Sequence, residues 1–209
     1  MKQAQKAVQS IVTRFETKAK DVANVLAGPR REGWFNAESL IALSKQSSLK
    51  LKMAYGEQGY RKICKGVSGK TTKGKRRRIP DLVLYNWKNE PLVIIEAKLV
   101  YRSDTAKKRD ELIRELADQI LEAKNCCPIA TCVGIVYLIS RTSDRPRKHV
   151  RQTTDRFCFE IKTKLEDLLK SMQYNWVREP SILPRLNPRA TSFTNVGVSV
   201  WLGLGAVAL

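Results

Sequence analysis

Two apolar runs between residues 80 and 101 are broken by charged residues, and this feature most limits how the chain can fold. The first run begins with Asp81 in "PDLVLY", and the second, "PLVIIEAKLV", contains Glu96 and Lys98. Both runs predict strands, and the polar "NWKNE" between them predicts a hairpin turn. A carboxylate buried in a strand costs several kcal/mol unless a partner compensates it. Charged residues in these strands are therefore expected to have a compensating partner or a functional role.

Strand geometry brings the three charged residues together. Successive side chains alternate between faces, so Glu96 and Lys98 project on one side while Ile95 and Ala97 project on the other. In a hairpin the start of the first strand lies opposite the end of the second, which puts Asp81 beside them. Paired carboxylates bind Mg²⁺ through oxygen, and the cation activates water and neutralises a phosphodiester. A lysine there can position the nucleophile or stabilise the transition state.

The spacing of these residues resembles that of the PD-(D/E)xK nuclease superfamily. Pro80-Asp81, fourteen intervening residues and Glu96-Ala97-Lys98 carry the resemblance, which covers about residues 34–140. It implies an α/β fold, the restriction-endonuclease-like three-layer sandwich with a central mixed sheet flanked by helices. It also implies that Asp81, Glu96 and the Ala97 carbonyl bind Mg²⁺, with Mn²⁺ able to substitute, and that Lys98 is the catalytic lysine. The alternative is a coincidental salt bridge in an ordinary sheet.

Two further site residues are implied by the same resemblance. Many members add a glutamate from the first core helix, for which Glu38 is the candidate and Glu57 the reserve. The alternative for Glu38 is that an acid simply favours a helix N-terminus. Some members add a glutamine from the helix after the lysine strand, and Gln119 borders the apolar stripe of such a helix. Ala123 stands where exonuclease-like branches carry a tyrosine, which argues against that branch.

Positive charge is concentrated in the first part of the chain. The whole sequence carries +19, and residues 1–80 hold 19 basic and 5 acidic residues. Such a surface attracts polyanions, which favours nucleic acid; a solubilising surface or an anionic membrane are the alternatives. A glycine-broken segment is expected to bind phosphates through Lys70, Lys73, Lys75, Arg76, Arg77 and Arg78. For Trp34, Tyr60, Tyr85 and Trp87, packing is the expected use of most, and stacking on unpaired bases is the alternative.

The remaining patterns predict an α/β sandwich around a mixed sheet. Helices are expected over 3–26, from Asn36, over 104–124 and over 150–172, and a strand over 129–140. The expected organisation is an N-terminal basic helical region (1–33), a nuclease core (34–176) and a C-terminal extension packed on the core (177–209). Residues 196–209 are apolar but too short to span a bilayer as a helix, so a strand or a docked tail is expected.

Cysteine usage points to a reducing compartment. The five cysteines are odd in number, and no secretory signal precedes them: Cys64, Cys126, Cys127, Cys132 and Cys158. They lack paired metal-binding spacing and His149 is the only histidine, so core packing is favoured over a metal site or a histidine-based triad.

Together these features predict a Mg²⁺-dependent DNA endonuclease of restriction or defence type. It is expected to be a cytoplasmic homodimer that does not bind membranes, because cutting two strands commonly needs two sites related by a twofold axis. A DNA-repair or Holliday-junction nuclease is the nearest alternative. A non-catalytic nucleic-acid-binding protein on the same fold, or an architectural or RNA-associated basic protein, is the alternative from another class.

Overall fold

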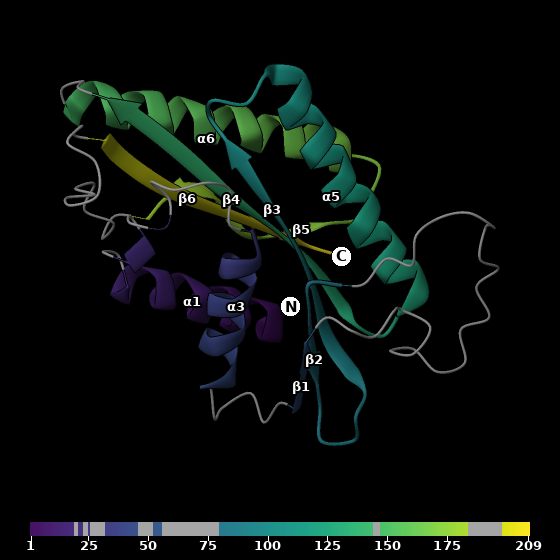
Figure 1. Cartoon of the computed structure of the whole chain (residues 1–209). Helices are drawn as coiled ribbons and strands as arrows, with labels where there is room; N and C mark the ends of the chain where they lie inside the picture. Colours follow the sequence, from purple (N-terminus) through teal and green to yellow (C-terminus); the bar gives the residue numbers. More distant parts are fainter. Residues whose placement is uncertain are drawn as a thin grey trace.

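A six-stranded mixed sheet lies between two layers of helices in the computed structural model (Figure 1). The structure describes residues 1–18, 21–22, 25, 32–45, 52–55, 80–143, 147–183 and 198–209. Its helices are α1 (Lys2–Thr17), α3 (Glu32–Ser44), α5 (Ala106–Cys126) and α6 (Arg147–Leu169). Its strands are β1 (Lys52–Tyr55), β2 (Leu82–Tyr85), β3 (Pro91–Tyr101), β4 (Thr131–Ser143), β5 (Asn175–Ile182) and β6 (Val198–Ala208).

The strands follow the order β1-β2-β3-β4-β6-β5 across the sheet. β1, β2 and β3 pair antiparallel in succession, and α5 then carries the chain to β4, which pairs parallel with β3. A parallel pair needs such a crossover, because a tight turn joins only antiparallel neighbours. β6 runs antiparallel to both β4 and β5. The predicted α/β class with a central mixed sheet flanked by helices is confirmed.

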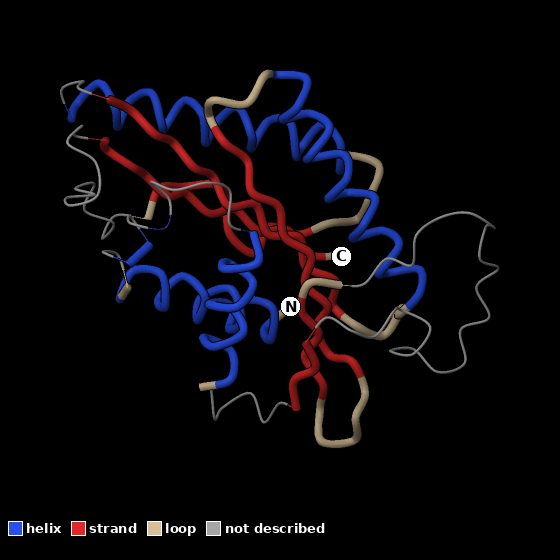
Figure 2. The backbone as a smooth tube through the Cα atoms, viewed as in Figure 1, coloured by secondary structure: helices blue, strands red, loops and turns tan. Residues whose placement is uncertain are grey.

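Both faces of the central strands are covered, which explains why β3 and β4 are almost continuously apolar. α1 and α3 pack on one face and α5 and α6 on the other, as Figure 2 also shows. In β3, Ile95 and Leu99 face the α1/α3 side, whereas Ile94 and Val100 face the α5/α6 side. The parity of a residue in β3 therefore decides which helical layer it meets.

The N-terminal helix belongs to the same core as the sheet. Phe15 of α1 is buried among Trp34, Phe35 and Tyr137, with ring centroids 6.1, 5.3 and 5.6 Å away. The predicted boundary at residue 33 therefore does not separate two packing units. The second predicted helix begins at Glu32 rather than at Asn36, which is buried inside α3.

The C-terminal strand is inserted into the sheet rather than packed on it. β6 pairs with β4 from Val133↔Ala208 to Ser143↔Val198, so it lies between β4 and β5. Leu202 and Leu204 contribute to the core under α1 and α3, and Val207 contributes to the opposite core. The strand alternative for residues 196–209 is thus correct over 198–208. Among the described helices, none is both long and apolar enough to cross a membrane.

Candidate active site

Asp81 is fixed at the start of β2 by hydrogen bonds from two different elements. The β2–β3 ladder ends at Leu82↔Ile95, so one further step brings Asp81 opposite Glu96. The backbone N–H of Ala97 donates to Asp81 Oδ2 at 2.7 Å, and Asn36 Nδ2 of α3 donates to Oδ1 at 2.9 Å. The carboxylate therefore has a defined orientation beside β3.

The environment of Asp81 favours its neutral form. Burial raises the pKa of this carboxyl, while the Ala97 N–H, the positive charge of Lys98 and the Asn36 amide act in the opposite direction. A raised pKa means that ionised Asp81 reduces stability at neutral pH relative to the unfolded chain. A cation beside the carboxylate would favour the charged form and relieve this cost.

The Glu96 side chain and the Ala97 carbonyl point in different directions from β3. Glu96 is only 2% exposed and shares the parity of Ile94 and Val100, so it projects toward the α5/α6 side. The N–H and C=O of one strand residue point toward the same neighbouring strand. Because the Ala97 N–H reaches Asp81, its carbonyl also points past the start of β2, on the side of that carboxylate.

Helix α5 places Glu115 beside Lys98 and Gln119 one turn further along. Lys98 Nζ lies 3.8 Å from Glu115 Oε2, which sets the helix over the strand. β3 and α5 run in opposite directions. Glu96 lies two strand residues, about 7 Å, before Lys98. Gln119 lies four helix residues, about 6 Å, after Glu115, and therefore at the level of Glu96. Gln119 Oε1 is buried and accepts no hydrogen bond within the described part of the chain. Gln119 therefore lies over the Glu96 segment with an unused acceptor.

A glycine in the neighbouring strand makes room for α5 beside Glu96. Gly134 is its partner across the parallel ladder, and a Cβ there would lie 2.2 Å from Ile120 Cδ1. The missing side chain lets α5 approach the sheet closely.

Cys132, two residues before Gly134, is buried. Burial and the negative charge of Glu96 raise the pKa of its thiol to about 12, although the positive charge of Lys124 acts in the opposite direction. Cys132 is therefore a neutral thiol at neutral pH.

These donors fit a hard cation. Two carboxylates and a backbone carbonyl are oxygen ligands of the type that Mg²⁺ binds, with waters or phosphate oxygens completing the octahedron. Across the described ranges, no group of three or more His, Cys, Asp and Glu side chains gathers that could hold a metal. Within that part of the chain, the candidate donors are the Asp81 and Glu96 carboxylates and the Ala97 carbonyl.

The helix residue that reaches Asp81 is Asn36 rather than the predicted Glu38. Glu38 Oε2 accepts a hydrogen bond from Arg14 Nε of α1 at 2.7 Å. Residues two apart on a helix differ by about 200° in direction, so Asn36 and Glu38 face different elements. Neither Asn36, which was expected only to begin a helix, nor Glu115 was predicted from the sequence as a site residue. Glu57 and the basic segment Lys70, Lys73, Lys75, Arg76, Arg77 and Arg78 lie outside the described residues.

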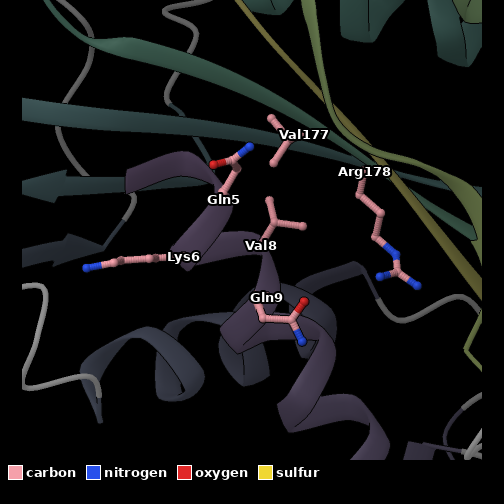
Figure 3. Close-up of a pocket in the computed structure, with 6 residues that line it drawn as sticks. All are labelled: Gln5, Lys6, Val8, Gln9, Val177 and Arg178. Atoms are coloured by element: carbon pink, nitrogen blue, oxygen red, sulfur yellow. The ribbon is translucent and has the colours of Figure 1, made fainter. Parts of the chain in front are cut away.

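A separate hollow between α1 and β5 does not gather functional groups. It measures about 320 Å³ and is lined by Gln5, Lys6, Val8, Gln9, Val177 and Arg178. Figure 3 shows the Lys6 and Arg178 side chains pointing in different directions, so their charges do not converge. The candidate site is therefore the Asp81 region rather than this hollow.

The cysteines are in two chemical states. Cys126, Cys132 and Cys158 carry free thiols, whereas Cys127 is disulfide-bonded. A disulfide is more typical of an oxidising compartment than of the reducing one expected from the sequence. A cytoplasmic location therefore stays a prediction.

Comparisons with known proteins give no relative for this chain. No protein-family model matches it, and no curated protein and no solved structure matches it either.

Asn36→Ala is expected to weaken Mn²⁺ binding about 10- to 100-fold, because removing a hydrogen-bond partner of a metal-ligating carboxylate has effects of this size. Isothermal titration with Mn²⁺ measures the affinity directly. The matched control is Glu38→Gln on the same helix, which breaks the pair with Arg14 and should leave the affinity within about twofold. The reverse pattern would assign the metal-site role to Glu38.

Proposed function

We propose that this chain is a Mg²⁺-dependent nuclease of the PD-(D/E)xK type, acting on DNA as an endonuclease of restriction or defence type. The observation that carries the proposal is the hydrogen bond from the Ala97 N–H to Asp81, which holds that carboxylate at the start of β2 beside the Glu96-Ala97-Lys98 segment of β3. The path α3, β1, β2, β3, α5, β4 supports it, because the superfamily implied by the motif has a mixed sheet flanked by helices.

Each residue has a distinct role in the proposed hydrolysis. In the overall reaction a water oxygen bonds to phosphorus and one ester P–O bond breaks, which leaves a hydroxyl and a phosphate monoester. Asp81 and Glu96, with the Ala97 carbonyl, would hold Mg²⁺, which when bound supplies water activation and charge neutralisation. Lys98 would orient the attacking water or donate to the developing negative charge on the phosphate.

The pairing of Lys98 suggests how its ammonium is held before substrate arrives. Glu115 is more than half exposed and its carboxylate lies 3.8 Å from Lys98 Nζ, whereas the Lys98 side chain is only 16% exposed. The pair is long and open to solvent on the glutamate side, so it contributes little to stability, about 1 kcal/mol or less. A phosphate can therefore replace Glu115 as the partner of Lys98 at small cost.

Cleavage of supercoiled plasmid with Mg²⁺, Mn²⁺, Ca²⁺ or EDTA tests the proposed function. We expect nicking or linearisation with Mg²⁺ or Mn²⁺ and intact plasmid with EDTA, since the site has oxygen ligands only. Discrete fragments would support restriction. Intact plasmid under every condition, together with intact branched DNA and RNA, would reject the nuclease and leave a non-catalytic binding protein on the same fold.

A further inference from the structure

The turn between β2 and β3 exposes a tryptophan to solvent, and hydrogen bonds stabilise the turn around it. Trp87 is 73% exposed, whereas Trp34 packs against Phe15 and Phe35. Packing within the hairpin therefore does not explain Trp87. An indole has a large apolar face that prefers a partner to water.

The support of Trp87 is a dense set of hydrogen bonds around Asn86. Asn86 Oδ1 accepts from the backbone N–H groups of Lys88 and Glu90, both at 2.9 Å, and Asn86 Nδ2 donates to Glu90 Oε2 at 2.7 Å. Asn89 has φ 59°, a left-handed conformation that Asn tolerates in turns. A turn fixed in this way holds Trp87 in position before any partner binds.

The residue after Trp87 adds a cation to the same turn. Lys88 is exposed and directly follows Trp87. The tip surface is defined as Trp87 and Lys88. It combines an aromatic face with a cation.

We propose that the tip surface binds unpaired bases of a nucleic acid, with Trp87 stacking on a base and Lys88 contacting the adjoining phosphate. Stacking does not depend on the base sequence, because every base has a π-face. Binding surfaces of this kind combine aromatic with basic side chains. The net charge of +19 favours a polyanion over a protein partner.

The distance from the tip to the candidate site gives the substrate class, and this step rests on the proposed function. Trp87 is six residues from Asp81, and because Trp87 lies in the turn after β2, the two residues are less than about 20 Å apart. Six stacked nucleotides at about 3.4 Å each span about 20 Å. The unpaired bases would then lie within about six nucleotides of a cut made at Asp81 and Lys98, so gapped, frayed or branched DNA fits better than an intact duplex.

Binding of a fluorescein-labelled oligo(dT) and of a duplex of equal length, both in EDTA, tests the tip without requiring cleavage. We expect Trp87→Ala to weaken oligo(dT) binding about tenfold and to leave duplex binding unchanged, with Trp87→Phe restoring most of the loss. The control is Phe159→Ala on α6, which removes another exposed aromatic, 69% exposed, away from the tip.

Unchanged oligo(dT) binding by Trp87→Ala would overturn the proposal, as would an equal loss on the duplex. Self-association of wild type that Trp87→Ala abolishes, with oligo(dT) binding intact, would assign the tip to a second copy of this chain and also overturn it. If Trp87→Ala weakens oligo(dT) binding but the wild type cuts no DNA, base binding by the tip surface is supported and the proposed nuclease activity is rejected. The two failures are therefore distinguishable.

Discussion

Lys98→Ala is expected to lower the rate of plasmid cleavage by about 10²- to 10³-fold while DNA affinity stays within about twofold. Removal of one preorganised group that stabilises transition-state charge has this effect on rate. Binding persists because the phosphate contacts of a basic protein are spread over many side chains. Single-turnover cleavage with saturating Mg²⁺ measures the rate, and a filter-binding titration in Ca²⁺ measures the affinity.

The control for this variant is Lys170→Ala, which removes an equal charge from an exposed lysine paired only locally with Asp167. Folding of Lys98→Ala is expected to be intact, because the ion pair that Lys98 forms among the described residues is the long one with Glu115. Cleavage by Lys98→Ala at the wild-type rate would reject the assigned mechanism. Equal losses in both lysine variants would indicate a general effect of charge.

Phe15→Ala is expected to lower the free energy of unfolding by about 3–5 kcal/mol, the usual cost of removing a buried aromatic ring. Phe15 lies 5.6 Å from Tyr137 in a near-perpendicular arrangement and also contacts Phe35, so the cavity would open between α1, α3 and β4. Urea unfolding followed by far-UV circular dichroism gives the value.

Thr13→Ala serves as the control on the same helix, because Thr13 is exposed and its change should stay within about 0.5 kcal/mol. If Phe15→Ala costs less than about 1 kcal/mol, α1 does not unfold with the sheet. The boundary predicted at residue 33 would then separate two cooperative units after all.

The strands and helices that carry the motif could be predicted because their signals are local. The apolar runs around Asp81 and Glu96 indicated strands, and the three-and-four spacing of apolar residues indicated α5. The exact pairing could not be predicted from the turn, because the register shifts by one residue between Leu84 and Tyr85. The position of Asp81 beside Ala97 depends on that shift.

The contribution of α3 could not be predicted because it depends on how the helix is rotated about its axis. That rotation is set by the burial of Phe35 and Leu43 against α1 and the sheet. With those residues inward, Asn36 meets Asp81 and Glu38 meets Arg14. Nothing in the sequence near Glu38 indicates a partner 24 residues earlier.

The position of β6 was also beyond local reasoning, because strand order depends on pairings between distant segments. An apolar run with glycines is compatible with an edge strand, a central strand or a docked tail. Only its pairing with β4 along eleven residue pairs, and with β5 on the other side, decides among them.

The late arrival of β6 has a consequence for synthesis on the ribosome. β4 ends at Ser143, yet its second neighbour begins only at Val198, so β4 emerges with one edge unpaired while more than fifty residues are still being added. At about 5–20 residues per second this interval lasts several seconds. An exposed edge of an apolar strand is a template for pairing with other chains. Aggregation of the nascent chain is therefore expected to increase when translation is slow or interrupted after residue 143. Chaperone binding is expected during the same interval.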